Sequence, residues 1–318
     1  MDFEYYGISE ETRDKLIAER DTFIVDYWRD DRHFSRHKSK DKGFSSRIVD
    51  KNIYENLRRS FYASGGHYEY QGVFNGYRQS EFIELHLHNK YILIVDFKNC
   101  YRNITFDHFS KVIIPRISSL ETPLPMDLVQ ALYFPHGYLQ AGLSASNIIC
   151  DLVLKYNFDK EINARVHQGS TVLADYSRYY DDLHISASNR EILQDIYKKI
   201  KQISKDVSLP LNYRKCQLRK TDGVKILGSR ISDGAIRISR QEKNNLRAAI
   251  YELENTQYED RSYEHRLRSV IYRLSRIYRS EVGANNKYTE LLDHFRSELD
   301  ALTQDYEPHE IIELQSIK

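Results

Sequence analysis

The sequence predicts an α+β fold, and three observations support that prediction. Hydrophobic residues make up 41% of the 318 residues, which is enough for a packed core. As far as residue 238, short runs rich in Ile, Val and Tyr alternate with helical apolar spacing. Beyond that residue only helical spacing occurs. We therefore expect a compact region of helices and strands, followed by an all-helical region.

The first half of the mixed region should contain helices around one buried strand. Ser9 precedes acidic residues as helix N-caps do, and Val49, Ile53 and Leu57 follow helical spacing. The run YILIV has the composition of a buried strand. The expected elements are a helix at 9–26, a basic loop or hairpin at 33–46, a helix at 49–63, a strand at 91–97 and the start of a short helix at 106–112.

The second half continues this mixture and then becomes purely helical. Apolar stripes at helical spacing mark most of it, and strand composition recurs twice. The expected elements are a helix at 143–156, two strands within 171–187 around a tight acidic turn, an amphipathic helix at 191–207, two short strands within 225–238 around a Ser-Asp-Gly turn, and helices at 239–255, 262–280 and 287–302.

Charge is segregated along the chain although the formal net charge is only +1. Residues 28–59 carry ten Lys and Arg against five Asp and Glu, and residues 236–279 carry ten against six. Residues 281–318 reverse the sign, with nine acids against three bases. The two basic segments are either solvated helix faces or surfaces that follow a phosphate backbone, and this pattern leaves both interpretations open.

Several classes of protein are excluded by composition. The three cysteines, Cys100, Cys150 and Cys216, are far apart and form no CxxC pair, so neither a disulfide framework nor a structural zinc site is expected. The first residues are acidic and lack an apolar signal core, and no apolar run is long enough to span a bilayer. We therefore expect a cytoplasmic protein with no membrane partner.

Carboxylates at two strand ends are the sharpest chemical feature. Asp181 and Asp182 lie within SRYYDDLHIS, where a hairpin would expose them at its tip, and Asp96 follows the strand YILIV. Each feature alone is typical of a turn or a helix cap. Together they could converge on one face of a sheet, and two-metal phosphoryl or nucleotidyl transfer requires such a cluster of hard oxygen ligands.

Four stretches resemble the five conserved motifs of reverse transcriptases. The matching stretches are VDFKNCYRNI for motif A, FPHGYLQAGLSASNIICDLVL for motif B, RYYDDLHIS for motif C and LPLNYRKCQLRKTDGVKILGSRI for motifs D and E. They follow the family's order between residues 92 and 231. The segment NKYILIVDFKNCYRNITFDHF is most similar to the abortive-infection and defence-associated (unknown-group) branch of bacterial reverse transcriptases. Retron-type enzymes are the second choice, because their usual Val-Thr-Gly at motif E is Ile-Leu-Gly here.

The resemblance implies a right-hand polymerase fold with three domains. Residues 1–90 would form the fingers, on the stretches SRIVDKNIYENL and NGYRQSEFIEL. Residues 91–238 would form the palm, with motifs A to E around a small antiparallel sheet. Residues 239–318 would form a helical thumb and an acidic tail. No ribonuclease H, maturase or endonuclease domain is visible in the sequence.

The resemblance also implies roles for the palm carboxylates and their neighbours. Asp96 and Asp181 would hold two Mg²⁺ ions, or Mn²⁺, with Asp182 beside them and the carbonyl of Phe97 completing a ligand shell. Tyr101 matches the steric gate, where an aromatic ring crowds a ribose 2′-hydroxyl and so favours deoxynucleotides. Lys215 matches the motif D lysine, which would protonate or stabilise the leaving pyrophosphate.

Further residues would contact the nucleotide or the primer. Gly137, His136, Gln140 and Arg47 are the candidates for nucleotide binding, and Leu227 with Gly228 matches the primer grip. Motif B departs from the family pattern at two positions, since His136 replaces the usual Gln and Ala141 the usual Ser. These departures concern template and nucleotide contacts rather than metal chemistry.

The helix expected at 262–280 combines an apolar stripe with an arginine-rich remainder. Such a face is either solvated or lies along a template–primer backbone, and an apparent lack of compensating acids favours the second. The arginines concerned are Arg266, Arg268, Arg273, Arg276 and Arg279.

The sequence thus favours an RNA-directed DNA polymerase, with two alternatives. One alternative is a polymerase-fold subunit that binds or assembles RNA without catalysis, and the other is template-independent or protein-primed DNA synthesis. The expected partners are an RNA template, in the form of a dedicated non-coding RNA, together with dNTPs and a DNA product. The sequence leaves open whether a companion defence protein or a second copy of the chain, in a homo-oligomer, is also a partner, and antiphage defence is the role that the resemblance implies.

Overall fold

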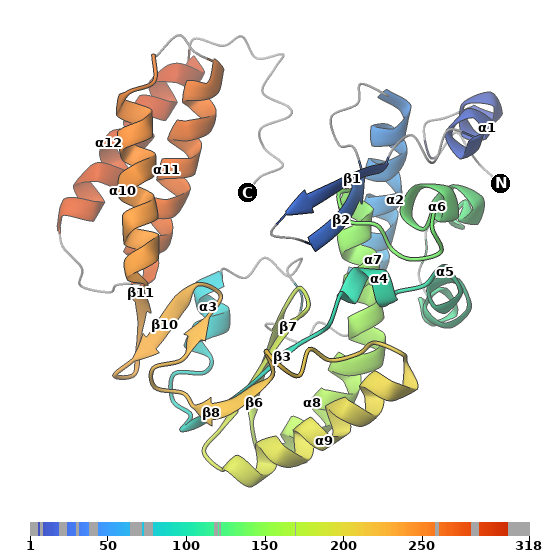
Figure 1. Cartoon of the computed structure of the whole chain (residues 1–318), viewed down its shortest axis with the longest axis horizontal. Helices are drawn as coiled ribbons and strands as arrows, with labels where there is room; N and C mark the ends of the chain where they lie inside the picture. The colour runs from blue at the N-terminus through green and yellow to red at the C-terminus, as the bar shows by residue number, and fades with distance from the viewer. Residues whose placement is uncertain are drawn as a thin grey trace. The chain divides into compact units, whose positions relative to one another are not determined.

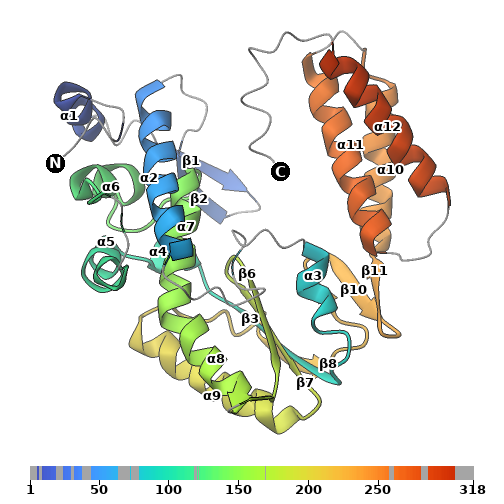
Figure 2. The ribbon, with the colours of Figure 1, turned by 180° about the vertical axis from the view of Figure 1, so that it is seen from behind.

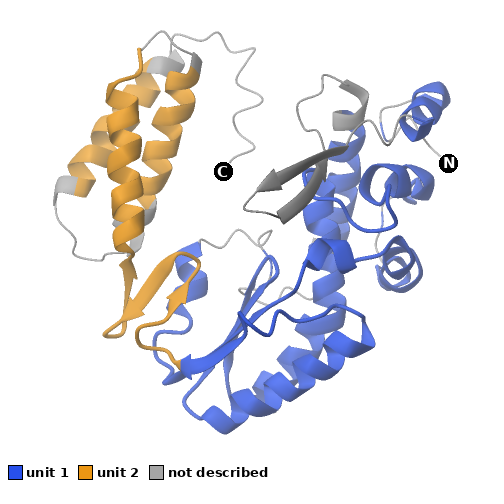
Figure 3. Ribbon diagram, in the orientation of Figure 1, with its two compact units in different colours: residues 1–219 blue, residues 220–318 orange. Residues whose placement is uncertain are grey.

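The computed structural model consists of two compact units, residues 1–219 and 220–318 (Figure 3). The structure describes residues 6, 9–18, 24–29, 32–37, 44–63, 72, 79–117, 120, 122–168, 170–257, 261–280 and 286–304. Both units contain helices and short antiparallel sheets, and the second unit ends in helices alone (Figure 1). The α+β composition expected from the sequence is therefore present.

The first unit begins with helices and one hairpin and continues as a helix-covered sheet. Its elements are α1 (Glu10–Ala18), β1 (Ile24–Arg29), β2 (Arg32–His37), α2 (Phe44–Ala63), α3 (Gln79–Glu84), β3 (Tyr91–Asp96), α4 (Cys100–Asn103), α5 (Phe106–His108), α6 (Met126–Tyr133), α7 (Ser144–Leu154), α8 (Lys160–Val166), β4 (His167–Gln168), β5 (Thr171–Val172), β6 (Asp175–Tyr179), β7 (Asp182–Ala187), α9 (Arg190–Asp206) and β8 (Gln217–Lys220).

A four-stranded sheet in the order β6-β7-β3-β8 forms the centre of the first unit. Strand β7 pairs antiparallel with both β3 and β6, and its middle residues are buried on both faces. Helices α8 and α9 lie along one side of the sheet in both views (Figures 1 and 2). The α9 side chains Leu193, Ile196, Ile200 and Ile203 are buried, because their spacing places them on one helix face.

A buried carboxylate joins helix α2 to helix α7. The Asp50 side chain accepts hydrogen bonds from the backbone N–H groups of Ser144 and Ala145, at 2.9 and 3.0 Å, and from the Tyr133 hydroxyl at 3.0 Å. These N–H groups belong to the first turn of α7, where backbone N–H groups have no hydrogen-bond acceptor within the helix. Asp50 therefore caps α7 from another element and fixes its N-terminus.

The second unit consists of a three-stranded sheet followed by three helices. Its elements are β9 (Lys225–Ile226), β10 (Ser229–Ser232), β11 (Ala235–Ile238), α10 (Arg240–Glu254), α11 (Arg261–Ser280) and α12 (Asn286–Gln304). The helices share a separate hydrophobic core in which Leu246, Leu267, Val270, Leu274 and Leu292 are buried. The Ser239 hydroxyl accepts a hydrogen bond from the N–H of Glu242 at 3.1 Å and caps α10.

Most expected elements are confirmed within a few residues, and four expectations are wrong. The helix expected at 9–26 ends at Ala18, and Ile24–Arg29 is a strand instead. The β-branched and aromatic residues of that strand have strand propensity, and it pairs with β2 along its whole length. Residues 171–187 and 225–238 each form three strands rather than two, because the short strands β5 and β9 precede the two expected hairpins. In the acidic hairpin, Asp182 is the first residue of β7, so the tip is Tyr180–Asp181.

Helices α3, α4, α6 and α8 and strands β4 and β8 were not expected from the sequence. In α6 the apolar residues are too dense to show a helical stripe, whereas α8 (KEINARV) contains few apolar residues. The division into fingers, palm and thumb stays a prediction. No helix among the described residues is long and apolar enough to cross a membrane.

Candidate active site

The carboxylates of the two motif strands lie side by side. In the antiparallel pairing of β3 with β7, Asp96 is directly opposite Asp182. Asp181 lies in the two-residue turn between β6 and β7, where Tyr179 pairs with Asp182. Directly opposite residues of an antiparallel pair have Cβ atoms about 4.5–5.5 Å apart. The fold therefore brings together the three acids on which the sequence analysis depends.

Crowding of these acids changes their proton affinity. Burial raises the pKa of Asp182 to about 6, and the charges of Asp181 and Asp96 add to the increase. Burial also raises the pKa of Asp181, again with a contribution from Asp96. Like charges in a partly desolvated place disfavour the ionised form. The cluster therefore holds more negative charge than its protein surroundings neutralise.

Lys215 is the cation that contacts this cluster. Its Nζ lies 2.8 Å from Asp96 Oδ2, and the Asp96 side chain is 14% exposed against 63% for Lys215. The hydrogen bond to Asp96 raises the pKa of Lys215, so that the amine stays an ammonium. The backbone supports this contact, because the Asp96 carbonyl accepts from the N–H of Asn212 at 2.8 Å. The motif D lysine thus reaches the motif A carboxylate.

The chemical type of the donor atoms at this site suits a divalent metal ion. Carboxylate oxygens are the ligands that Mg²⁺ prefers. The raised pKa of Asp182 indicates that a bound cation would stabilise the ionised form of this carboxylate. Among the described residues, however, no three His, Cys, Asp or Glu side chains are gathered closely enough to hold a metal ion. Asp96 is paired with Lys215 instead.

Residues next to Asp96 belong partly to the core. Phe97 is buried, and its ring meets Phe158 edge to face at 4.8 Å. The Tyr101 hydroxyl donates to Asn147 Oδ1 of α7 at 2.7 Å, which fixes its ring against the motif B helix. Burial raises the pKa of Tyr101, so the phenol stays protonated. Tyr101 is therefore a rigid side chain close to the carboxylates, as the steric-gate prediction needs.

The turn of motif B has two exposed candidates and one buried candidate. Gly137 has a φ of +82°, and a Cβ there would meet nothing within 4 Å, so its conformation rather than lack of space calls for glycine. His136 is exposed. Gln140 is buried, and its Nε2 has no hydrogen-bond partner among the described residues. The Arg47 side chain lies outside the described residues.

The expected primer grip is a tight hairpin turn of the second unit. Leu227 and Gly228 have φ values of +48° and +81°, and Ile226 pairs with Ser229 across them. Two positive φ values in a two-residue loop define a type I′ turn, which matches the twist of the strands. Glycine suits this geometry at position 228, whereas leucine at position 227 adopts it at a cost in backbone strain. The role in primer binding stays a prediction.

The arginines of α11 do have compensating acids, contrary to the expectation. Arg266 is 3.3 Å from Glu252, Arg268 is 2.7 Å from Glu264, and Arg273 is 3.6 Å from Glu242. Two of these acids come from α10, a neighbouring helix. The Arg276 and Arg279 side chains lie outside the described residues. Backbone contact by these arginines stays a prediction, but its original argument is lost.

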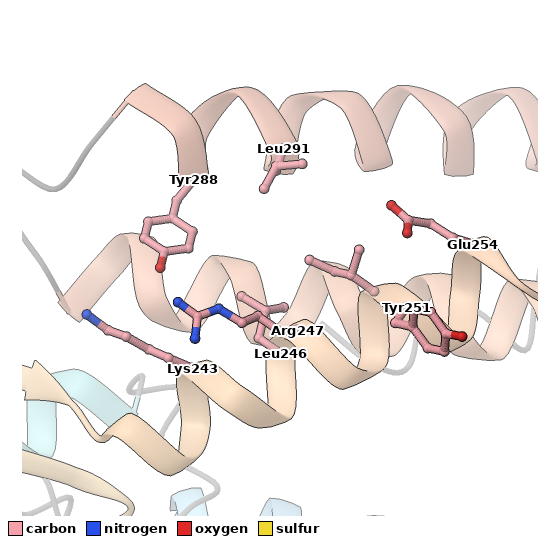
Figure 4. Close-up of a pocket in the computed structure, with 8 residues that line it drawn as sticks. Lys243, Leu246, Arg247, Tyr251, Glu254, Tyr288 and Leu291 are labelled. Atoms are coloured by element: carbon pink, nitrogen blue, oxygen red, sulfur yellow. The ribbon is translucent and has the colours of Figure 1, made fainter.

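A groove between α10 and α12 is lined by cationic and aromatic side chains (Figure 4). It has a volume of about 470 Å³ and is lined by Lys243, Leu246, Arg247, Ile250, Tyr251, Glu254, Tyr288 and Leu291. Arg247 donates to Asn244 at 3.2 Å, and no acidic side chain forms an ion pair with it in the described part of the chain. The Tyr251 side chain is 67% exposed. Cations beside exposed aromatic rings are typical of single-stranded nucleic-acid surfaces.

Sequence analysis missed a buried ionic cluster beneath the acidic turn. Arg178 of β6 is fully buried and forms ion pairs with Asp151 at 2.5 Å and Asp159 at 2.7 Å. Its Nη1 also donates to the carbonyl of Tyr180 at 3.0 Å. A charged residue in the middle of a buried strand was the available signal, because such a residue is almost never buried without partners.

Comparison with known proteins places the chain in a family. The family model described as reverse transcriptase (RNA-dependent DNA polymerase) matches residues 39–231. No curated protein matches the chain. The matched residues include all five motifs and both carboxylate-bearing turns.

Solved telomerase structures resemble the chain in fold. Apo telomerase from Candida tropicalis matches with a TM-score of 0.51 and 10% identity, over 96% of this chain and 66% of that chain. A C-terminally truncated form from the same organism gives 0.48 and 13%, over 68% and 54%. Telomerase from Candida albicans with a TWJ fragment of telomeric RNA gives 0.47 and 11%, over 94% and 65%.

This chain therefore spans between about half and two thirds of the length of those structures. The family match and the likeness at a TM-score of 0.51 show the expected right-hand polymerase fold.

Proposed function

The chain belongs to the reverse transcriptase (RNA-dependent DNA polymerase) family, whose model matches more than half of its residues, and on that premise we propose that it is an RNA-directed DNA polymerase. The observation that supports this activity most directly is the pairing of Asp96 with Asp182 across two strands, with Asp181 in the adjoining turn. Burial and mutual repulsion raise the pKa values of Asp181 and Asp182, so ionised carboxylates at these positions do not stabilise the fold.

The three carboxylates would hold two divalent ions, with Mg²⁺ as the natural choice and Mn²⁺ as a substitute. Bound ions of this type lower the pKa of an attacking hydroxyl and stabilise the charge of a leaving pyrophosphate. The carbonyl of Phe97 is the further ligand that the family resemblance suggests. Lys215, held as an ammonium beside Asp96, would stabilise negative charge on the leaving phosphates.

Selection of deoxynucleotides would fall to Tyr101. Its ring is fixed at the hydroxyl end by Asn147, and a fixed ring can exclude a ribose 2′-hydroxyl by steric contact. Gly137 and Gln140 would shape the neighbouring nucleotide contacts. The unpartnered amide of Gln140 is a donor that a nucleotide or an ordered water could satisfy.

The template would be an RNA, and the groove of the second unit supports such a partner. Lys243 and Arg247 are one helical turn apart on α10, and Tyr251 follows one turn later. This order offers phosphate contacts next to a stacking surface. A dedicated non-coding RNA, a cytoplasmic location and a role in antiphage defence within the abortive-infection branch are further parts of the proposal, supported by the motif resemblance alone.

A second candidate function is RNA binding or assembly without catalysis. The Lys215–Asp96 ion pair favours it, because an ammonium already neutralises one of the three acids. Protein-primed or template-independent synthesis is a variant of the first function. Protein priming predicts DNA that remains attached to the protein after denaturation, and template-independent synthesis predicts a product that is not complementary to any supplied RNA.

Nucleotide incorporation by protein purified with its own nucleic acid would test these candidates. Each dNTP should be supplied singly and in mixture with Mg²⁺, and Asp96→Asn provides the matched control. DNA synthesis that requires Mg²⁺ and is lost in the control would support the polymerase. A folded wild-type protein that binds RNA and incorporates nothing would support the binding subunit instead.

A further inference from the structure

The turn that carries Asp181 adopts an uncommon backbone conformation. Tyr180 has a φ of +54°, in the left-handed region. That region costs an L-residue with a large side chain roughly 1–2 kcal/mol, and glycine is usual there. Such a conformation persists only when the surrounding structure imposes it. Something next to Tyr180 must therefore supply the constraint.

The guanidinium of Arg178 contacts the turn directly. Nη1 donates to the Tyr180 carbonyl at 3.0 Å and to Asp151 Oδ1 at 2.5 Å. Nε and Nη2 donate to the two oxygens of Asp159 at 2.8 and 2.7 Å. The donors of this one side chain thus connect the turn to α7 and to the segment that follows it.

The two acids are themselves held in place. The Tyr176 hydroxyl donates to Asp159 Oδ1 at 2.6 Å. Gly72 lies against Asp151, because a Cβ at position 72 would fall 2.5 Å from Asp151 Oδ2. The N–H of Gly72 also donates to the Arg178 carbonyl at 2.8 Å. The cluster is therefore enclosed and rigid.

Stability alone does not account for a buried ionic cluster. Desolvation of such charges offsets most of their attraction, and well-packed apolar residues stabilise a core equally well. An apolar side chain at position 178 could not, however, hydrogen-bond the Tyr180 carbonyl. The hydrogen bond from the Arg178 guanidinium to the Tyr180 carbonyl therefore explains why a charged residue occupies this buried position.

We propose that Arg178 is a positioning residue, which through its bonds to Tyr180, Asp151 and Asp159 sets the turn that presents Asp181. The inference rests on the proposed function only for the meaning of Asp181 in catalysis. Its structural part, the restraint of the turn by Arg178, holds independently of any activity.

The test uses two kinds of variant in the full-length protein. Arg178→Lys keeps the charge but cannot bridge both acids and the carbonyl. Gly72→Ala removes no charge and pushes the Asp151 carboxylate away. Gly234→Ala is its matched control, because Gly234 also has a positive φ, +69°, and a Cβ there would meet nothing within 4 Å.

Two readouts separate positioning from folding and from the proposed function. Amide hydrogen exchange over 179–182 should accelerate at least about 10-fold in Arg178→Lys and Gly72→Ala, while exchange over α9 and in Gly234→Ala is unchanged. The kcat for DNA synthesis should fall about 10²-fold with a smaller change in the dNTP KM, as expected for misplaced reacting groups.

Unchanged exchange at the turn in both variants would overturn the proposal, whatever the activity. Faster exchange with wild-type kcat would equally overturn it, since the turn would then be free to move without consequence. Faster exchange in a protein whose wild type makes no DNA would leave the restraint established and refute the polymerase function. If Arg178→Lys loses exchange protection throughout the protein, that variant is unfolded. The exchange and kcat of Gly72→Ala then test the proposal.

Discussion

Arginine occurs in two contrasting settings in this molecule. In the first unit, Arg178 is fully buried between Asp151 and Asp159, directly beneath the acidic turn. In the second unit, Arg266 and Arg268 lie on a helix surface, with side chains 41% and 37% exposed, and pair with glutamates that are also exposed. In the first setting one arginine is bonded to two buried acids and to the backbone of the turn. The second shows that an arginine-rich face does not by itself mark a nucleic-acid contact.

The largest effect is expected at the acidic turn that Arg178 supports. Asp181→Asn keeps the shape of the side chain and removes its charge, so binding of divalent ions should weaken. Metal-ion catalysis contributes several kcal/mol, and the loss should lower kcat for DNA synthesis at least about 10³-fold. Steady-state kinetics on a defined primer–template would measure it. An Asp181→Asn enzyme within 10-fold of wild type would show that Asp181 is not a metal ligand.

The two arginine settings should differ strongly in stability. Arg178→Met removes the cationic partner of two buried carboxylates and should cost about 3–5 kcal/mol in the free energy of unfolding. Arg268→Met removes an exposed pair and should cost about 0–1 kcal/mol. Urea unfolding followed by circular dichroism measures both. Equal costs for the two variants would contradict the contrast drawn between the two settings.

Sugar selection tests the neighbouring ring. Tyr101→Ala opens the space beside the carboxylates, and incorporation of ribonucleotides relative to deoxynucleotides should rise about 10- to 100-fold. Tyr101→Phe keeps the ring, loses the bond to Asn147, and should change this ratio little. Competition between rNTP and dNTP at one template position provides the measurement. An unchanged ratio in Tyr101→Ala would place sugar selection elsewhere.

Burial of Asp182, together with repulsion from the neighbouring acids, predicts a variant that is more stable than wild type. The pKa of Asp182 is raised to about 6, so the folded state binds this proton more tightly than the unfolded state. The resulting destabilisation is absent below the unfolded-state pKa of about 4, grows between about pH 4 and pH 6, and is complete above pH 6. Asp182→Asn should therefore stabilise the protein by about 1–2 kcal/mol at pH 8, allowing for solvent screening, and hardly at pH 4.

Thermal unfolding of wild type and Asp182→Asn at the two pH values would measure that gain. Addition of Mg²⁺ should reduce the difference at pH 8, because a bound cation relieves the same repulsion. A gain of equal size at both pH values would show that packing rather than charge explains it.

The smallest effect concerns RNA affinity. Arg247→Gln removes a cation with no ion pair in the described residues, whereas Arg266→Gln removes one that Glu252 already neutralises. We expect Arg247→Gln to weaken single-stranded RNA binding several-fold and to lower the slope of log K against log salt by about one. Arg266→Gln should change neither. Filter binding over a salt series would distinguish the two variants. A larger loss of RNA affinity in Arg266→Gln than in Arg247→Gln would instead indicate that RNA contacts the arginines of α11.

The secondary structure around Asp96, Asp181 and Asp182 was predictable from sequence, because their neighbours determine a strand, a two-residue turn and a second strand. The exact pairing of Asp96 with Asp182 required the register, which depends on both strands at once. The strand at Ile24–Arg29 was missed because helix-start signals at Ser9 were extended too far. Pairing with β2 stabilises the strand conformation of these residues, and the sequence of one segment does not show which other segment it pairs with.

Charge compensation was the least predictable feature. The acids that neutralise Arg266 and Arg273 come from α10, so the pattern of α11 alone could not reveal them. The same limit hid the Arg178 cluster, whose acids come from residues 151 and 159 in another helical segment. Patterns within one element predict its burial well, whereas partners between elements need the fold.

The most direct test of the account is extension of a DNA primer on an RNA template of defined sequence, titrated with Mg²⁺, by wild type and Asp181→Asn in parallel. The account predicts a DNA product complementary to the template, made only with Mg²⁺ or Mn²⁺ and only by wild type. Equal extension by both proteins, or none by a folded wild type that binds the primer–template, would contradict it.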